Sequence, residues 1–282
     1  MVTIAWTALA LLAFAANSLL CRGALSGAGM DAGSFTLLRL LSGAVTLSVL
    51  TLMTRQWQSG DWQWRFALKA GLALFGYALL FSYAYLHLST GTGALLLFGS
   101  VQMSLLVLYR LQGNHLSGLE MTGMAISVSG FVYLMLPSAT RPDLWSAIMM
   151  ILSGVSWALF TLLGKQASSP QKAITQGFVI ASLLCLVTLP WLPSFATLPR
   201  DGVVLALGSG AVASGLGYVV WYYALTQLTL LQASISQLAV PAIAALMGTV
   251  LLAESLYWQQ LLSGALVLGG IACVFIARAK QS

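Results

Sequence analysis

Apolar runs about twenty residues long, separated by short connections, occupy this chain from end to end. A helix needs about 20 consecutive apolar residues to cross the hydrocarbon core of a bilayer. Two runs, 203–225 and 230–252, are joined by only a few residues and predict a tight transmembrane hairpin. Only 6% of the 282 residues are charged and 59% are hydrophobic, which leaves too few charges to cover a soluble surface. The sequence therefore predicts an all-α polytopic membrane protein.

Ten runs have a suitable length, so we expect ten transmembrane helices. They are 2–20, 34–53, 70–88, 93–111, 121–137, 144–163, 173–192, 203–225, 230–252 and 256–277. No connection is long enough to fold as a separate soluble domain. The first run lacks a preceding basic segment, so we expect it to stay as a helix and not to be removed as a signal peptide.

Lysine and arginine are distributed unevenly between the two sides that these runs define. The side of both termini collects eight of the twelve: Arg55, Arg65, Lys69, Arg110, Lys165, Lys172, Arg278 and Lys280. The opposite side collects Arg22, Arg141 and Arg200, and Arg39 lies inside a run. Short loops follow the positive-inside rule, so we expect both termini in the cytoplasm and the chain in a bacterial inner membrane. The net charge of +6 then reports orientation and does not indicate a nucleic-acid partner.

The two halves of the chain echo one another at an offset of about 140 residues. Ser82-Tyr83-Ala84-Tyr85-Leu86 matches Trp221-Tyr222-Tyr223-Ala224-Leu225, and three other short matches keep the same order. We therefore expect one five-helix repeat at 1–138 and another at 139–282. Because five is odd, the second copy enters the membrane from the opposite side. Inverted repeats of this kind are typical of alternating-access transporters, with the substrate site near the midplane, although channels can be built in the same way.

Several short motifs carry a family resemblance. The second half has an aromatic-Ala helix end at Tyr222-Tyr223-Ala224-Leu225, then Val240-Pro241, then an apolar-Ala-Glu end at Glu254, and finally Gly264. It resembles the EamA-type domain of the drug/metabolite transporter superfamily. The first half is similar through Asn17, Arg22 and Arg39, and the aromatic-rich interior resembles the aromatic amino acid exporter (YddG-like) branch. The first half departs where Gln102 replaces the proline and Gln112-Gly113-Asn114 replaces the glutamate.

The titratable residues provide little chemistry at membrane depth. All six carboxylates lie in connections or at run ends. His87 is the candidate proton carrier; alternatively, it is a histidine at the membrane interface whose imidazole is in contact with water. Arg39 could reach the interface, contact a substrate carboxylate, or bond a loop carbonyl. The three cysteines have no metal-binding spacing, no set of catalytic residues is visible, and we expect no metal, no cofactor and no enzymatic activity.

Aromatic, amide and hydroxyl side chains recur on single faces of several runs by i, i+3 and i+4 spacing. Such groups suit a neutral amphipathic solute, although helix packing and interfacial anchoring would explain them too. The candidate substrate-binding residues are Asn17, Tyr77, Phe98, Gln102, Trp157, Phe160, Tyr218, Trp221 and Gln237. Pro241 and Gly217 are candidate hinges for a gate.

These features predict a secondary transporter that exports small amphipathic metabolites, with aromatic amino acids as the leading substrates. A multidrug or other metabolite exporter, or a channel-like facilitator, is the alternative on the same fold. The partners expected are a small-molecule substrate and the lipid bilayer. A monomer is expected, with a dimer left open.

Overall fold

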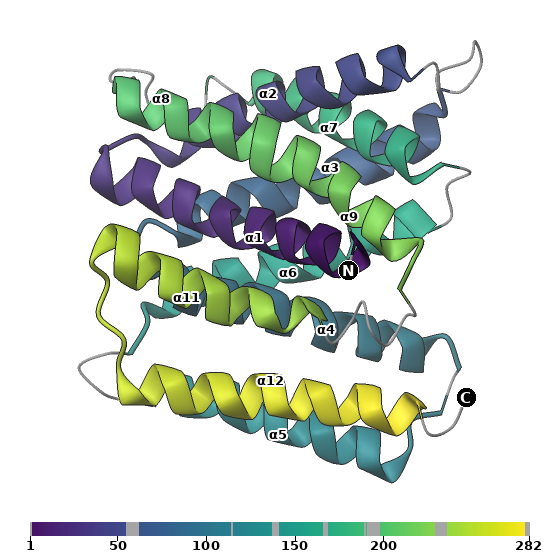
Figure 1. Cartoon of the computed structure of the whole chain (residues 1–282), viewed down its shortest axis with the longest axis vertical. Coiled ribbons are helices and arrows are strands. Elements are labelled where there is room, and N and C mark those ends of the chain that lie inside the picture. Colours follow the sequence, from purple (N-terminus) through teal and green to yellow (C-terminus); the bar gives the residue numbers. More distant parts are fainter. Residues whose placement is uncertain are drawn as a thin grey trace.

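The computed structural model describes residues 2–54, 62–113, 115–136, 141–165, 169–188, 190, 198–228 and 236–279. Over these residues the chain is helical, and its helices lie side by side across the molecule (Figure 1). The elements are α1 (Val2–Arg22), η1 (Gly23–Gly27), α2 (Ala32–Met53), α3 (Trp64–Ala84), α4 (Thr90–Leu111), α5 (Gly118–Leu134), α6 (Leu144–Lys165), α7 (Pro170–Val187), α8 (Arg200–Leu207), η3 (Gly208–Leu216), α9 (Gly217–Leu225), α11 (Ala239–Leu252) and α12 (Trp258–Ala279). The two η elements are π-helical.

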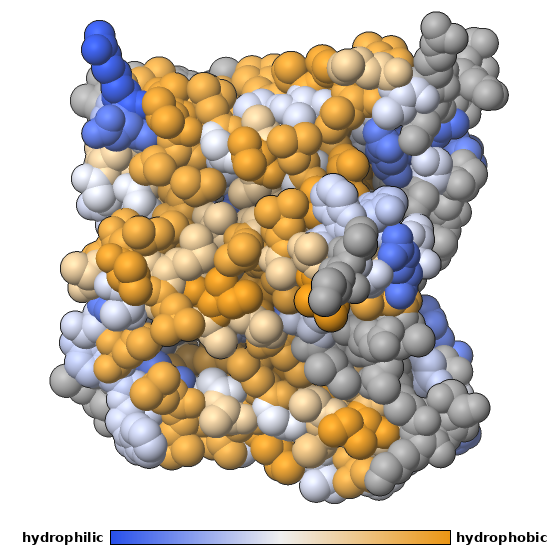
Figure 2. Space-filling view, in the orientation of Figure 1, coloured by the Kyte–Doolittle hydropathy of each residue, from blue (hydrophilic) through white to orange (hydrophobic). Residues whose placement is uncertain are grey.

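The hydropathy of the surface is that of a membrane protein. Among the described helices, seven are long and apolar enough to cross a membrane. Shorter apolar helices cover Gly118–Leu134, Gln171–Val187 and Ala239–Leu252. Apolar residues fill the middle of the face shown in Figure 2, and hydrophilic residues gather at the two ends of the helices. The prediction of an all-helical, multi-pass membrane protein is confirmed, while the number of ten spans stays a prediction.

Most described helices begin and end within about five residues of the predicted runs, and three elements differ more. The third helix spans Trp64–Ala84 and not 70–88, because Ser89 begins the next helix by accepting a hydrogen bond from the backbone N–H of Thr92. The expected helix 230–252 is described only from its later part, with α11 beginning at Ala239. The expected run 203–225 is three consecutive elements, α8, η3 and α9, rather than one regular helix.

The glycines of η3 allow this π-helical segment to lie against α2. A β-carbon at Gly210 would overlap the backbone oxygen of Arg39, and one at Gly215 would lie 3.1 Å from the side chain of Thr46. Small residues permit helix backbones to approach in this way. Close packing against α2 is therefore the role of these two glycines.

Helix packing divides the molecule into a main bundle and a helix pair. In the main bundle, α1 packs against η3, α9 and α11, while α6 packs against α3 and α4, and α2 packs against α7. The pair consists of α5 and α12, which lie together at the lower edge of Figure 1 and meet the bundle chiefly through α4. Their backbones touch, since a β-carbon on Gly123 would lie 2.6 Å from the carbonyl oxygen of Gly270.

The first and last helices share one end of the bundle. In Figure 1, α1 begins and α12 ends at the right-hand face. An odd number of crossings would separate these two helix ends, so the arrangement agrees with an even number. Arg55 and Lys280, which contribute to the charge count on that side, lie outside the described residues. The cytoplasmic location of this face stays a prediction.

Candidate functional site

A cavity of about 250 Å³ lies between the helices of the main bundle. All nine residues predicted to bind substrate line it, so the structure brings the whole predicted set together; substrate binding itself stays a prediction. The described lining is Phe14, Asn17 and Ser18 of α1, Tyr77 and Phe81 of α3, Leu97, Phe98, Val101, Gln102 and Leu105 of α4, Trp157, Phe160, Thr161 and Gly164 of α6, Ile174 of α7, Tyr218, Trp221 and Leu225 of α9, and Gln237.

Aromatic rings form a continuous wall of the cavity. The indole of Trp157 stacks on Tyr218, with ring centroids 5.3 Å apart and planes inclined by 20°. Trp157 also lies 4.8 Å from Tyr77 and 5.4 Å from Phe160, measured between centroids. On the side of α1, the ring of Phe14 lies 5.7 Å from Trp221. Offset and edge-to-face pairs hold one another in place, so the wall presents fixed ring faces to a planar apolar solute.

Polar groups enter the wall at a few points. Asn17 is tied at both ends of its amide: its Nδ2 donates to the Tyr77 hydroxyl at 3.4 Å, and its Oδ1 accepts from the Ser209 hydroxyl at 2.5 Å. Gln102 is buried, and Gln237 is half-buried near the start of α11. The described lining contains no Asp, Glu, Lys or Arg. A few oriented polar groups in an apolar cavity are typical of small-molecule sites.

Arg39 lies directly behind this wall. Its side chain is only 1% exposed, and its Nη2 donates to the Tyr77 hydroxyl at 2.7 Å. The guanidinium carbon also lies 4.7 Å from the ring centroid of Phe81 and 5.0 Å from that of Tyr77. Of the three interpretations of Arg39, reaching the membrane interface does not fit this burial, and the hydrogen-bond partner is a phenol rather than a loop carbonyl. The faces of the Phe81 and Tyr77 rings attract this desolvated cation through the cation–π interaction.

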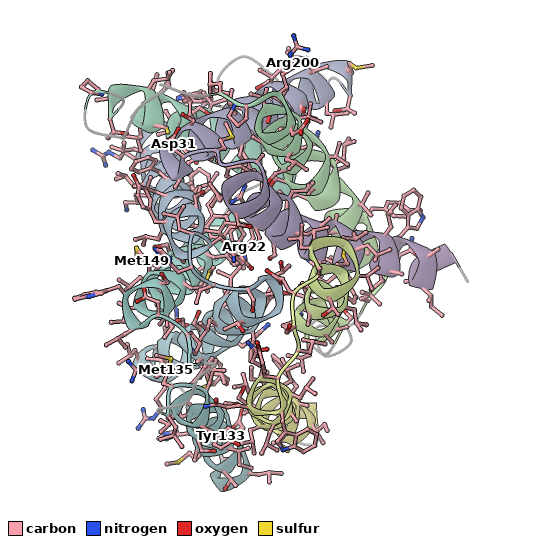
Figure 3. The ribbon with its side chains drawn as sticks, turned by 90° about the vertical axis from the view of Figure 1, so that its left-hand side faces the viewer. Arg22, Asp31, Tyr133, Met135, Met149 and Arg200 are labelled. Atoms are coloured by element: carbon pink, nitrogen blue, oxygen red, sulfur yellow. The ribbon has the colours of Figure 1, made fainter. Side chains whose placement is uncertain are left out.

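One end of the bundle is closed by a cluster of polar contacts. Arg22 donates from Nη1 to the backbone oxygens of Tyr85 and Leu86, at 2.9 Å each, and from Nε to Glu254 at 3.3 Å. The second oxygen of Glu254 accepts from the backbone N–H of Thr90 at 2.8 Å. We call these contacts the clamp. Seen along the helices, Arg22 lies near the centre of the bundle (Figure 3).

The clamp marks the end that the cavity does not reach. Along α1 the lining stops at Ser18, and Arg22 lies one turn further on. At the other end the lining extends to residues in the last turns of their helices, Gly164 and Leu225. The cavity therefore runs from the middle of the bundle toward the face where α1 begins.

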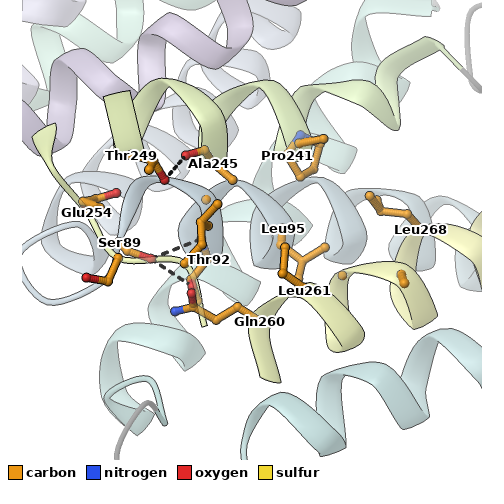
Figure 4. Close-up of a pocket in the computed structure, with 16 residues that line it drawn as sticks. Ser89, Thr92, Leu95, Pro241, Ala245, Thr249, Glu254, Gln260, Leu261 and Leu268 are labelled. Atoms are coloured by element: carbon orange, nitrogen blue, oxygen red, sulfur yellow. Dashed lines mark hydrogen bonds between the residues drawn. The ribbon is translucent and has the colours of Figure 1, made fainter. Parts of the chain in front are cut away.

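A second, smaller pocket of about 200 Å³ lies between α4, α11 and α12 (Figure 4). The candidate hinge Pro241 lines this pocket and not the central cavity. Ser236 and Gln237 are helical, Leu238 is a turn, and α11 begins at Ala239. Pro241 explains the interruption, because it has no N–H to donate to the carbonyl of Gln237. Its role as a hinge stays a prediction.

The other candidate residues lie away from the central cavity. Gly217 begins α9, and a β-carbon there would lie 2.9 Å from that of Ala13, so this glycine permits close packing against α1. His87 is exposed on the turn between α3 and α4 and lines neither pocket. The nearby carboxyl of Asp143 has a pKa below its usual value because the backbone and side chain of Ser146 donate to it, with His87 and Arg141 adding favourable charge.

Sequence reasoning missed several contributors to the site, among them Ile174, Ser209 and Phe81. Ile174 was not assigned to the lining, because the face of α7 that points inward cannot be recognised in a helix that is apolar on several sides. Ser209 was missed because its contact with Asn17 joins residues 192 positions apart. Phe81 shares the helical face of Tyr77 by i+4 spacing, and that spacing was the available signal for including it.

A helical membrane bundle with a cavity between its helices can hold a small solute within the membrane, as a membrane transporter must. The model of the EamA-like transporter family matches residues 144–276. An uncharacterized protein of Pseudomonas aeruginosa is 44% identical over 279 residues, which cover 98% of this chain and 95% of that protein. The chain belongs to the EamA-like transporter family.

More distant relatives agree with this assignment. A protein of Streptantibioticus cattleyicolor named as a probable terminal-alkyne amino-acid exporter is 24% identical, with 90% of this chain and 86% of that protein covered. An uncharacterized transporter of Archaeoglobus fulgidus is 29% identical over 86% of both chains. A protein of known crystal structure, 19% identical, matches with a TM-score of 0.69 over 98% of both chains, which shows a shared fold.

Proposed function

We propose that this chain is a secondary transporter that exports small amphipathic metabolites, with aromatic amino acids as the leading substrates, by alternating access through the central cavity. The observation that carries the proposal is the cavity itself. Aromatic rings from five helices and the amide groups of Asn17, Gln102 and Gln237 line the same cavity. A ring can stack on Trp157 while a polar end is hydrogen-bonded by the amides. Because one chain supplies the whole lining, a monomer is expected to suffice.

The packing of the helices supports an inverted repeat of two five-helix halves, 1–138 and 139–282, around this cavity. α1 packs against α9 and α11, just as α6 packs against α3 and α4. The helix pairs α2 with α7, α4 with α11, and α5 with α12 each join corresponding members of the two halves. Exchanging the halves therefore maps these helix contacts onto one another. A pseudo-two-fold of this kind supplies the two mirror-related states that alternating access needs.

Orientation follows from the charge distribution. With ten spans in a bacterial inner membrane, the face where α1 begins is cytoplasmic by the positive-inside rule. The central cavity then extends toward the cytoplasm, and the clamp lies at the outer end. The structure corresponds in this reading to an inward-facing state that is ready to take up solute from the cell.

The substrate class rests on charge as well as shape. The described lining holds no carboxylate, and the buried Arg39 cation lies one side chain behind it. The positive charge of Arg39 would repel a lipophilic cation in the cavity, and no carboxylate of the described lining would offset this repulsion. The charge distribution therefore disfavours a multidrug exporter of cations. The name of the Streptantibioticus cattleyicolor relative refers to an amino acid, which agrees with a solute that bears a carboxylate. A channel-like facilitator differs from a carrier, because unlabelled solute on the opposite side of the membrane does not accelerate uptake of the labelled solute.

The test is counterflow in vesicles reconstituted with the full chain. We expect unlabelled Phe, Tyr or Trp inside the vesicles to accelerate uptake of the labelled amino acid, with no comparable flux of a lipophilic cation. Trp157→Ala and Gln102→Ala should each reduce this flux at least about tenfold, since each removes a wall group from the cavity. Trp145→Ala is the matched control, because Trp145 lies on the same helix but is 71% exposed. Unchanged counterflow in both cavity variants would exclude this cavity as the route.

A further inference from the structure

We infer that the hydroxyl of Tyr77 binds the carboxylate of the solute and that Arg39, behind it, makes this subsite selective for anionic groups. The inference rests on the proposed function and deepens it, because it names the chemical group that the cavity recognises. It starts from the hydrogen-bonding capacity of a phenol. A tyrosine hydroxyl has one hydrogen to donate and two lone pairs that accept.

Both accepting positions of the Tyr77 oxygen are occupied. Arg39 donates to it at 2.7 Å from one side, and Asn17 donates at 3.4 Å from another. The Ser209 hydroxyl, which donates to the amide oxygen of Asn17, fixes the orientation of that amide. The hydrogen of the Tyr77 hydroxyl must therefore point away from both donors. Because Tyr77 lines the central cavity, the solute is the acceptor that this hydrogen can reach.

Arg39 decides which kind of acceptor is preferred. Its side chain is buried, and two of its nitrogens, Nε and Nη1, have no hydrogen-bond partner among the described residues. A cation buried without an anion is strongly destabilised, and an anion brought nearby recovers part of that cost. The guanidinium also polarises the phenol that it bonds, which strengthens the O–H as a donor. Both effects strengthen the binding of a carboxylate at the Tyr77 hydroxyl, whereas they strengthen the binding of a neutral amide only slightly.

The position of Tyr77 in the aromatic wall places the rest of the solute. Its ring centroid lies 4.8 Å from that of Trp157, which in turn stacks on Tyr218. A carboxylate held at Tyr77 therefore leaves an aromatic body within reach of the Trp157 face. The subsite selects small solutes with a carboxylate on one end and an apolar or aromatic body on the other, and it discriminates against their amides, esters and amines.

The test compares acids with their amides on the purified full-length protein. Binding is followed by tryptophan fluorescence with two pairs of probes: phenylalanine with phenylalaninamide, and 3-phenylpropionate with 3-phenylpropanamide. We expect the wild type to bind each acid roughly tenfold or more tightly than its amide, since a hydrogen bond to a charged group is typically stronger by such a factor. Tyr77→Phe should remove most of this preference by weakening acid binding while leaving amide binding unchanged. Tyr133→Phe, on α5 and outside the cavity lining, is the matched control.

Substitutions of Arg39 give a second, independent readout. Arg39→Lys keeps the charge and should retain part of the preference for the acid, whereas Arg39→Gln should abolish it; a purely structural role would weaken acid and amide binding equally. If 3-phenylpropionate is preferred and phenylalanine is neither bound nor transported, the subsite stands and the amino-acid substrate is wrong. Equal binding of acids and amides by the wild type, or a full preference retained in Tyr77→Phe, would overturn the subsite.

Discussion

Replacing Glu254 with alanine is expected to loosen the closed end of the bundle. Its carboxylate joins three separate segments: Arg22 at the end of α1, the backbone N–H of Thr90 at the start of α4, and α11, from whose end it projects. A carboxylate at a helix N-terminus also interacts favourably with the helix dipole. The substitution therefore removes both an ion pair and a helix cap at the end opposite to the one that the cavity approaches.

The magnitude follows from the two hydrogen bonds. The bond from Thr90 is short, at 2.8 Å, and resembles an N-cap, whose loss costs about 1 kcal/mol. The pair with Arg22 is longer, at 3.3 Å, and its side chains are 21% and 15% exposed. A pair of that kind contributes up to about 1 kcal/mol. We therefore expect Glu254→Ala to lower the free energy of unfolding by about 2 kcal/mol, and Glu254→Gln, which still offers an acceptor to Thr90, by about 1 kcal/mol.

The assay combines stability with accessibility. Cys21 is fully buried, directly beside Arg22 in the chain. With Cys185 and Cys273 replaced by alanine, it becomes a reporter for a membrane-impermeant thiol reagent. Glu254→Ala and Arg22→Gln should each raise its labelling rate and lower the melting temperature in detergent. Arg200→Gln, at an exposed arginine, should change neither.

A double-mutant cycle tests the reasoning most directly. Residues that interact give non-additive effects, here an expected coupling of about 0.5–1 kcal/mol between Arg22 and Glu254. If the two substitutions add without coupling, and Cys21 remains as protected as in the parent protein, the clamp does not hold this end closed.

Two glycines give further predictions, each with a control nearby. Gly248→Ala should lower the melting temperature and increase Cys21 labelling, because its β-carbon would overlap the carboxylate of the clamp; Gly264→Ala, whose nearest neighbour would be 3.8 Å away, should do neither. Gly270→Ala should destabilise the protein by about 1–3 kcal/mol, since the added carbon meets the backbone of α5 and forces α5 and α12 apart. Gly269→Ala, with open space around its β-carbon, should be tolerated. Thermal unfolding in one detergent compares all four, and equal melting temperatures within either pair would contradict the packing described.

The sequence predicted residues that line the central cavity better than it predicted the contacts between helices that shape it. Helical spacing groups residues by face, and an aromatic or amide residue on a membrane helix is costly against lipid, so faces that bear several such residues point inward. That reasoning was enough to select the residues around Trp157. Contacts between helices are a different matter. The bond between Arg39 and Tyr77 and the clamp between Arg22 and Glu254 depend on which helices become neighbours, and no spacing along one helix encodes that choice.

The clamp also shows where the two halves of the chain differ. One of the internal matches pairs Leu20-Cys21-Arg22-Gly23-Ala24 with Leu163-Gly164-Lys165-Gln166-Ala167, so Lys165 corresponds to Arg22. Gln112-Gly113-Asn114, in contrast, stands where the second half has Glu254. The first half therefore keeps the basic member of the pair and lacks the acidic one. Under an inverted repeat, an ion pair of this kind can form at the end that holds Arg22 and has no counterpart at the opposite end. If transport proceeds by the proposed alternating access, the two ends are expected to close by different means, with the electrostatic contribution at the end that the central cavity does not reach.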